Sequence, residues 1–353
     1  MVRSSIEKRS GTSVSRLEMA RAVHGRRRSV EVRVPASTAN LGSGFDCFGL
    51  ALQLHLTVRA TLVPEADERC RIRSRGEDGS ALLPRTAEKN LIVRAMRFAA
   101  ERQGLTLPPM RLAVHNGIPL ASGLGSSAAA IVAGISLCAL ISGSQIPDET
   151  ALGYATELEG HADNVAAALH GGLVITCMIP SGGVLALKKP WPLEIRVVVV
   201  TPHVTVETVH ARAVLPPAVS RADAVHNLQR AALFTAALEQ GRHDLLWEAM
   251  QDRLHQPHRQ GLVPGLAEAL ATPRLPGLLG VSLSGAGPSV LAFAQSHLEQ
   301  IGEAIAEPFR KHGIQTTVRN LAVDEHGRQT TDSSRGQAGS AEMGQVSGPG
   351  QGG

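Results

Sequence analysis

The segment PLASGLGSSAAA at residues 119–130 joins a loop with few side chains to the start of a helix. Gly123 and Gly125 have no side chain, and Ser126 and Ser127 carry only short hydroxyl groups. A helix N-terminus presents unpaired backbone N–H groups and a partial positive charge, so an anion can bind there when the preceding loop leaves room. The segment therefore predicts a phosphate-binding loop. A Gly-Ser turn followed by a capped helix is the alternative that these residues leave open.

The common nucleotide-binding loops do not fit this sequence. A Walker A loop requires Gly-Lys-Ser or Gly-Lys-Thr, and the chain contains no Gly-Lys pair. A Rossmann fingerprint requires a third glycine, but the Gly-Leu-Gly of residues 123–125 is followed by Ser-Ser-Ala. A nucleotide-binding loop at this position must therefore belong to another class.

The composition is that of a globular protein, with 353 residues, 43% hydrophobic content and a formal net charge of +4. This length is sufficient for two domains with their own cores. Residues 26–28 form an arginine cluster, but aromatic residues make up only 3% of the chain and no zinc or RNA-binding motif accompanies the cluster. We expect no nucleic-acid partner; a nucleic-acid binder that uses residues 26–28 stays open as an alternative.

Cysteine usage and apolar segments bear on the compartment. None of the cysteines belongs to a C-x-x-C pair; they are Cys47, Cys70, Cys138 and Cys177. This pattern favours free thiols in a reducing cytoplasm over zinc ligands or a disulfide framework. Residues 1–29 lack the apolar centre of a secretory signal, and the apolar segment 128–141 is too short to span a membrane. We therefore expect a cytoplasmic protein without a membrane partner.

Hydrophobic periodicity predicts a mixture of strands and helices. Strands are expected at 30–34, 54–62, 110–115, 173–178, 184–189 and 195–200, and helices at 88–103, 126–142 and 222–241. Two short helices broken around Gly160 are expected within 152–172, and residues 280–294 suggest a strand, a glycine turn, and a second strand or helix. The order lacks the regular alternation of a doubly wound sheet, so the predicted fold class is α+β.

The chain divides into four predicted segments. A disordered basic extension covers 1–29, two domains cover 30–193 and 194–323, and a disordered tail rich in Gly, Ser and Gln covers 324–353. The boundary near residue 193 is placed at KKPWPLE, where two prolines interrupt the pattern.

Three glycine-bearing stretches together resemble the GHMP kinase superfamily. They are VPASTANLGSGFDCFGLAL at 34–52, GIPLASGLGSSAAA at 117–130 and SLSGAGPSVLAF at 282–293. Further blocks are similar to the homoserine kinase family, namely EGHADNVAAALHGG at 159–172, TVHARAVLP at 208–216 and LHQPHR at 254–259. The resemblance extends from about Val30 to about Val323, and His170 stands where the family pattern leads us to expect an apolar residue.

The resemblance implies a two-domain GHMP kinase fold with its active site in the cleft between an ATP-binding N-terminal domain and a C-terminal domain. It implies transfer of the γ-phosphoryl group of ATP to the side-chain hydroxyl of L-homoserine, a step toward threonine. ATP and Mg²⁺ are the implied cofactors, and L-homoserine is the implied small-molecule partner. A homodimer stays open.

The resemblance also implies roles for the ATP-binding residues. These residues are Asn90, near the adenine, and Pro119, Leu120, Ala121, Ser122, Gly123, Leu124, Gly125, Ser126 and Ser127 around the phosphates. Ser126 and Glu157 are the implied Mg²⁺ ligands, since Mg²⁺ takes few protein oxygens besides phosphate and water. Glu159 is the alternative to Glu157, because E-L-E offers two carboxylates.

The substrate residues follow from the same blocks. Arg212 and Arg259 suit the carboxylate of homoserine, because a guanidinium binds a carboxylate through two hydrogen bonds, and Asp46 suits the ammonium. Asn40, His161, Asp163 and Asn164 are expected around the hydroxyl and the rest of the substrate. Asn164, Asp163, Arg212 and Ser126 are the expected catalytic residues. His255 and His258 are interpreted as structural.

Two questions stay open at this point. Asn164 stands where mevalonate-type relatives place an aspartate base, so the resemblance implies catalysis by positioning and charge stabilisation, with Asp163 as the remaining candidate base. The alternative functions are another GHMP-type kinase or decarboxylase of the mevalonate type, and a non-catalytic ATP-binding or anion-binding protein on the same fold.

Overall fold

A long antiparallel strand pair, β1 (Ser29–Ala39) and β2 (Phe48–Leu62), forms the centre of the first sheet. The computed structural model describes residues 28–63, 71–76, 86–180 and 182–333. Within them, the sheet order is β11-β1-β2-β4-β3, and the β5–β6 hairpin pairs with β2. The remaining strands of this sheet are β3 (Arg71–Gly76), β4 (Met110–Asn116), β5 (Leu173–Met178), β6 (Val184–Lys189) and β11 (Gln329–Asp332).

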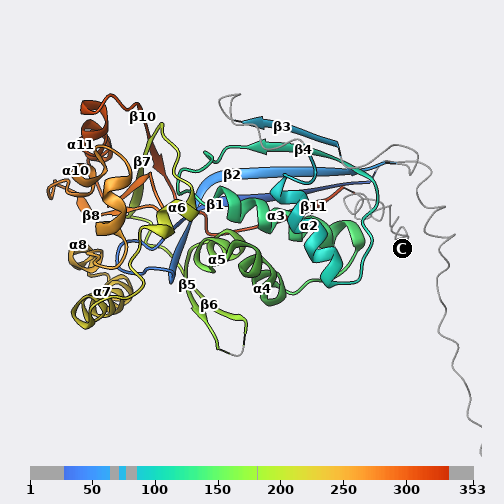
Figure 1. The fold of residues 1–353 in the computed structure, drawn as a ribbon, viewed down its shortest axis with the longest axis horizontal. Helices are drawn as coiled ribbons and strands as arrows, with labels where there is room; N and C mark the ends of the chain where they lie inside the picture. Colours follow the sequence, from blue (N-terminus) through green and yellow to red (C-terminus); the bar gives the residue numbers. More distant parts are fainter. Residues whose placement is uncertain (1–27, 64–70, 77–85, 181, 334–353) are drawn as a thin grey trace, which may run out of the picture.

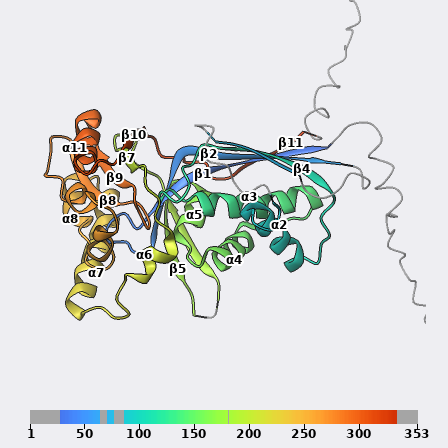
Figure 2. The same ribbon diagram turned by 45° about the horizontal axis from the view of Figure 1, so that its top comes forward.

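Four helices cover one face of this sheet (Figures 1 and 2). They are α2 (Leu91–Arg102), α3 (Ser126–Ser142), α4 (Asp148–Glu159) and α5 (Asp163–His170). Every residue of α3 from Ala128 to Cys138 is buried. Small side chains let α2 approach closely: a Cβ built on Gly134 would lie 2.3 Å from the backbone oxygen of Ile92. Among the described residues, no helix is both long and apolar enough to cross a membrane.

The second half of the chain builds a four-stranded antiparallel sheet in the order β10-β7-β9-β8. Its strands are β7 (Arg196–Pro202), β8 (Leu278–Leu283), β9 (Val290–Ala294) and β10 (Thr316–Leu321). Its helices are α6 (Thr208–Ala213), α7 (Arg221–Glu239), α8 (Leu246–Ala249), α9 (Gln256–Arg259), α10 (Leu266–Leu270) and α11 (Leu298–Lys311), with 3₁₀ turns η1 (His243–Leu245) and η2 (Gln260–Leu262).

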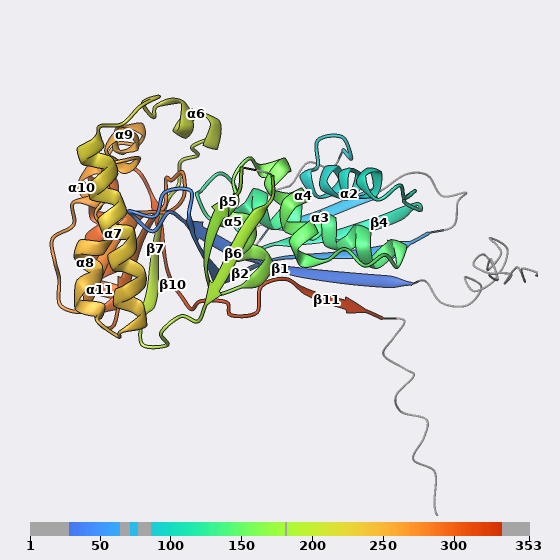
Figure 3. The same cartoon turned by 90° about the horizontal axis from the view of Figure 1, so that it is seen from below.

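The central strand β7 is buried on both faces, which explains its unbroken apolar run. Val197 and Val199 belong to the core shared with Phe234 of α7 and with the first sheet. Val198 and Val200 belong to a second core that includes residues of α10 and α11. Figure 3 shows these helices around the second sheet, beside the first domain.

Most predicted elements are present, and the α+β fold class is confirmed. Helix α3 has the predicted bounds, and Gly160 in the left-handed conformation ends α4 just before α5 begins. The strand predicted to end at Pro35 continues to Ala39, because the register with β2 shifts between Pro35 and Ala36 and pairing then resumes. Such an irregularity accommodates a proline, which has no N–H for the ladder.

The prediction of a disordered tail from residue 324 is wrong for residues 324–333. Val323 bridges Leu52, and β11 pairs with the edge of β1 in the first sheet. β11 has the sequence QTTD and is largely exposed, so it lacks the apolar alternation by which a strand is recognised. Residues 1–27 and 334–353, where the two disordered segments are otherwise predicted, lie outside the described residues.

Asp324 fixes the turn that leads into β11. Its Oδ2 lies 2.8 Å from Nε2 of His55, and its Oδ1 accepts bonds of 2.9 Å from the N–H groups of His326 and Gly327. Burial raises the pKa of Asp324, but these hydrogen bonds outweigh burial and hold the pKa below its usual value. A carboxyl whose pKa is depressed in the folded state stabilises the fold above its unfolded pKa and loses that contribution as the pH falls through the folded value.

We predict that Asp324→Asn lowers the free energy of unfolding by about 1–3 kcal/mol at neutral pH. The difference from the parent chain should shrink below about pH 4, where the unfolded carboxyl is protonated. Urea denaturation at several pH values measures both effects. Glu31→Gln is the control, because Glu31 pairs with Arg59 at the surface and such pairs contribute at most about 1 kcal/mol. Equal losses in the two variants would contradict the role of Asp324.

Candidate active site

One cavity lies where the two halves of the chain meet. The first half contributes Asn40, Asp46, Gly123, Gly125, Ser127, Glu159, His161, Asp163 and Asn164. The second half contributes Thr208, Arg212, Arg259, Gly285 and Ala286. The cavity therefore brings together most of the predicted substrate-binding and catalytic side chains and part of the predicted phosphate-binding loop.

The glycine loop before α3 leaves the helix N-terminus available to a ligand. Gly125 is the N-cap residue, with φ of 67°, and no side chain caps the helix. The loop carbonyls are turned toward neighbouring segments. Leu124 O accepts from Ser37 N at 3.1 Å, and Gly123 O accepts from Ser284 Oγ at 2.7 Å. The first N–H groups of α3, which have no intrahelical acceptor, thus remain for an anion.

The two loop glycines are required by packing as well as by backbone conformation. A Cβ on Gly123 would lie 2.2 Å from Ser284 O, and a Cβ on Gly125 would lie 2.1 Å from Ser37 Oγ. The loop therefore packs closely against the end of β1 and against the turn between β8 and β9. All three glycine-bearing stretches of the sequence meet at this point.

Two carboxylates and a histidine lie close together where α4 ends and α5 begins. His161 Nδ1 is 2.8 Å from Asp163 Oδ1, and His161 Nε2 is 3.9 Å from Glu159 Oε1. Burial lowers the pKa of His161, but the hydrogen bond to Asp163 and the nearby carboxylates outweigh burial and raise the pKa above its usual value. Asp163 Oδ1 also accepts from the Asn164 N–H at 2.7 Å, and Asn164 Oδ1 accepts from Ser37 Oγ at 2.9 Å.

The structure does not bring Glu157, the predicted Mg²⁺ ligand, to the cavity. Its half-exposed side chain forms an ion pair with Arg102 of α2. Glu159, the alternative, lines the cavity and accepts a hydrogen bond from Ser127. Successive helical residues are rotated by about 100°, so residues two apart point to nearly opposite sides. Leu152 and Ala155 are buried on one face of α4, and Glu159 lies on the same face because it follows Ala155 by four residues. Glu157 lies on a different face.

The loop between β1 and β2 carries the next two predicted residues. Asn40 and Asp46 both have positive φ, at 71° and 53°. Asn40 fixes this conformation, because its Oδ1 accepts from the Asp46 N–H at 3.0 Å and its Nδ2 donates to Gly285 O at 2.9 Å. Asp46 then forms a bidentate ion pair with Arg212, with N–O distances of 2.7 and 3.1 Å.

Arg259 carries a buried positive charge beside this pair. The residue is 1% exposed, and it donates to Ala211 O at 3.0 Å, Gly285 O at 3.1 Å and His255 Nδ1 at 3.2 Å. All three acceptors are neutral, and within the described residues no carboxylate forms an ion pair with Arg259. Burial, followed by the charge of Arg212, lowers the pKa of the guanidinium to about 10, so it stays charged at neutral pH.

The remaining predicted ATP-binding residues do not line the cavity. The Asn90 side chain is buried and caps α2 by accepting from the N–H groups of Ile92 and Val93. Ser122 and Leu124 are buried behind the loop; Pro119, Leu120 and Ser126 are partly buried, and Ala121 is exposed. Sequence reasoning did not single out Thr208, Gly285 or Ala286, although each lies inside a quoted block.

Comparison with known proteins shows which family the chain resembles. The model "GHMP kinases N terminal domain" matches residues 90–172, and "GHMP kinases C terminal" matches residues 234–311. Homoserine kinases from Solibacter usitatus and Deinococcus radiodurans are 42% and 43% identical to the chain, over 85% of this chain and 96% of each relative. This chain belongs to the homoserine kinase family. It is a small-molecule kinase, and the resemblance read from the motifs is confirmed.

The fold comparison is consistent with that assignment. The crystal structure of homoserine kinase from Cytophaga hutchinsonii superposes with a TM-score of 0.76 at 30% identity. The alignment covers 87% of this chain and 99% of that chain. The two-domain GHMP kinase fold is thus shared over nearly the whole length of the solved protein.

We predict that Gly125→Ala and Gly143→Ala have different effects, although the two glycines flank the same helix and both have positive φ. Alanine at such a φ costs about 1–2 kcal/mol of stability in either place. Only at Gly125 does the new methyl group also meet Ser37, whereas it meets nothing within 4 Å at Gly143. Gly125→Ala should therefore lower kcat/KM for L-homoserine by at least about 10-fold, because the N-terminus of α3 moves.

The measurement is steady-state ADP release at saturating Mg-ATP, together with urea denaturation of both variants. Gly143→Ala should retain the parent kcat/KM despite its loss of stability. Equal kinetics in the two variants would show that the packing around Gly125 does not set the geometry of the loop.

Proposed function

We propose that the cavity binds Mg-ATP and L-homoserine and that the chain transfers the γ-phosphoryl group to the homoserine hydroxyl, giving O-phospho-L-homoserine and ADP in the route to threonine. The observation that carries this proposal is the lining of the cavity, which combines the glycines before an uncapped helix N-terminus with Asp46, Arg212 and Arg259. We place the reaction in the cytoplasm, where the free thiols Cys47, Cys138 and Cys177 stay reduced.

The charged side chains suit a zwitterionic amino acid. The homoserine carboxylate gives buried Arg259 the ion-pair partner that no carboxylate of the described residues provides, and Arg212 can share it because both arginines line the cavity. The ammonium binds Asp46, whose oxygens each retain a lone pair beyond the bond from Arg212. The Asp46–Arg212 pair thus holds one acidic and one basic group side by side, as recognition of an ammonium and a carboxylate requires.

The phosphate side suits a nucleotide with Mg²⁺. The backbone N–H groups of residues 123–127 bind the phosphate oxygens, and Ser126 and Glu159 offer hard oxygen ligands beside them. The described residues contain no cluster of three His, Cys, Asp or Glu that could enclose a metal. A site with Ser126 and Glu159 as its protein ligands fits Mg²⁺, which is commonly held by one or two carboxylates plus phosphate and water. When bound, Mg²⁺ neutralises charge on the phosphates.

The residues at the start of α5 suit positioning of the attacking hydroxyl. Ser37 donates to Asn164 Oδ1, which fixes the amide, and the NH₂ group donates to Asp163 Oδ1 at 3.4 Å and keeps a second hydrogen for the substrate. An amide takes up no proton at neutral pH, and phosphoryl transfer through a loose transition state needs little help from a base. Asp163 Oδ1 contacts His161 and the backbone N–H of Asn164, so Asp163 orients these two neighbours. Asp163 is also the alternative proton acceptor. Arg212 adds positive charge near the transferred group.

The test of the proposed function is ADP release with Mg-ATP and a panel of homoserine, mevalonate, serine and galactose. We predict the highest kcat/KM for homoserine, by at least about 10-fold, because only homoserine presents both charges at the required distance from its hydroxyl. Preference for mevalonate would support a mevalonate-type kinase instead. Binding of ATP without turnover of any substrate would support a non-catalytic ATP-binding protein.

The two glutamates of α4 provide a matched pair for the metal site. We predict that Glu159→Gln lowers kcat by about 100-fold or more and raises the Mg²⁺ concentration needed for half-maximal rate, because the carboxylate beside the phosphates is lost. Glu157→Gln removes the same charge from the same helix but only breaks a surface pair with Arg102, so it should behave as the parent. Mg²⁺ titrations of both variants decide the assignment, and the reverse pattern would restore Glu157 as the ligand.

A further inference from the structure

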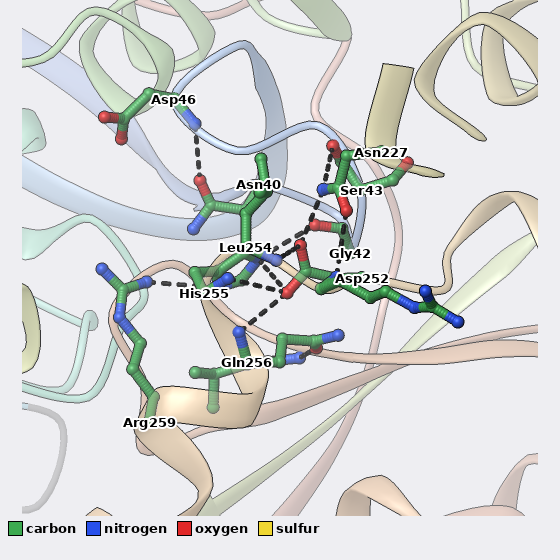
Figure 4. Close-up of polar contacts among 12 residues, drawn as sticks. Asn40, Gly42, Ser43, Asp46, Asn227, Asp252, Leu254, His255, Gln256 and Arg259 are labelled. Atoms are coloured by element: carbon green, nitrogen blue, oxygen red, sulfur yellow. Dashed lines mark hydrogen bonds and ion pairs between the residues drawn. The ribbon is translucent and has the colours of Figure 1, made fainter. Parts of the chain in front are cut away.

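His255 lies behind the cavity and connects two parts of the proposed substrate site. The side chain is fully buried, at 0% exposure, just before α9. Its Nε2 is 2.9 Å from the carbonyl oxygen of Gly42, and its Nδ1 is 3.2 Å from Nη1 of Arg259. Figure 4 shows the imidazole between these two groups, one from the β1–β2 loop and one from α9.

The partners of His255 define its protonation state. A guanidinium only donates, so Nδ1 must accept through its lone pair, and a carbonyl only accepts, so Nε2 must carry the proton. The imidazole is therefore neutral, with its proton on Nε2. Burial is the main cause that lowers the pKa of His255, and the charge of Arg259 acts in the same direction against that of Asp252. A proton on Nδ1 would oppose the N–H of Arg259.

The backbone around His255 is held by other contacts. Asp252 Oδ2 accepts from the N–H groups of His255 at 3.0 Å and Gln256 at 2.7 Å, which fixes the turn before α9. Asn227 donates to Asp252 and to Ser43 O, so it ties the same turn to the β1–β2 loop. The main chain here does not depend on the imidazole nitrogens, and the two bonds of the ring are left to orient Arg259 and Gly42.

The aromatic ring of Phe45 closes the arrangement. It stacks on the His255 imidazole with a centroid distance of 5.2 Å and an interplanar angle of 19°. The Cζ atoms of Arg259 and Arg212 lie 5.5 and 5.9 Å from the centroid of the same ring. Phe45 of the β1–β2 loop thus packs against the imidazole and lies beside both arginines.

We propose that His255 is a positioning residue for the amino-acid end of the substrate, joining the Gly42 carbonyl to Arg259 so that Asp46 and the two arginines keep a fixed separation. This inference rests on the proposed function, because it assigns Arg259 to the homoserine carboxylate. His255 touches no substrate atom and takes no part in the phosphoryl transfer. Its effect is on homoserine binding, and ATP binding on the far side of the cavity is independent of it.

Three variants separate the two hydrogen bonds from the packing. His255→Phe keeps a ring against Phe45 and removes both bonds. His255→Asn retains an acceptor near the Nδ1 position for Arg259, and His255→Gln retains a donor near the Nε2 position for Gly42. His258→Phe, at an exposed position on the same helix, is the control. KM and kcat are measured for homoserine and for ATP, with circular dichroism and urea denaturation to follow folding.

We expect His255→Phe to raise the homoserine KM by about 10- to 100-fold, with the ATP KM within about 2-fold of the parent. His255→Asn should recover most of the homoserine KM, since the bond to Arg259 is restored, and His255→Gln should recover less. In an Arg259→Ala background, His255→Phe should add little further loss. His258→Phe should match the parent.

A homoserine KM that stays at the parent value in the folded Phe, Asn and Gln variants would overturn the positioning role. Equal increases in the KM of homoserine and ATP would also overturn it, because they would show general loosening of the fold. If the Phe variant does not fold, the Asn and Gln variants carry the same comparison. The parent chain is assayed alongside, so absence of homoserine phosphorylation in the parent would count against the proposed function itself.

Discussion

The buried positive charge of Arg259 forms no ion pair with a carboxylate of the described residues, and much of the site is arranged around that constraint. Burial of a charge is costly unless other groups replace the lost water. Here the backbone oxygens of Ala211 and Gly285 and the lone pair of His255 replace it, and none of them neutralises the charge. A carboxylate that enters beside Arg259 can therefore form an ion pair in a buried place, where water screens the interaction less than at the surface.

The same acceptors couple the two halves of the chain. Gly285 O receives bonds from both Arg259 and Asn40, so the turn between β8 and β9 fixes a guanidinium of the second half and a loop of the first. The N–H of Gly285 returns a bond of 3.1 Å to Ala39 O at the end of β1. One step along the same turn, Ser284 holds the glycine loop at Gly123. A single turn thus contacts Arg259, the β1–β2 loop and the glycine loop before α3.

The sequence predicted the framework of the site because glycine, proline and apolar spacing have direct backbone consequences. The bare loop at 123–127, helix α3 and the break at Gly160 all follow from such rules. The position of Glu159 could have been found from the buried stripe of α4, but the choice between two nearby glutamates requires knowing which face meets the cavity. Asn90 could have been recognised as an N-cap before an apolar helix, which is the role the structure gives it.

Other features depend on contacts between distant segments, which no local pattern contains. His255 lies inside the block LHQPHR, but its contact with Gly42, more than two hundred residues earlier in the chain, is not contained in that block. The ion pair between Asp46 and Arg212 is equally remote in sequence. β11 is polar and exposed, and only its pairing with β1 makes it a strand. The resemblance marked Asp46 and Arg212 as substrate residues without showing that they pair, and β11 and His255 look like ordinary surface and core in a single sequence.

The central claim is that the charge of Arg259 is kept for the substrate carboxylate. The direct measurement compares kcat/KM for L-homoserine with that for 3-aminopropan-1-ol, which lacks only the carboxylate, in the parent chain and in Arg259→Ala. The account predicts that removal of the carboxylate costs the parent about 100-fold or more and costs Arg259→Ala about 10-fold or less, since the arginine that recognises the group is gone. An equal cost in both proteins would show that Arg259 does not bind the carboxylate and would contradict the account.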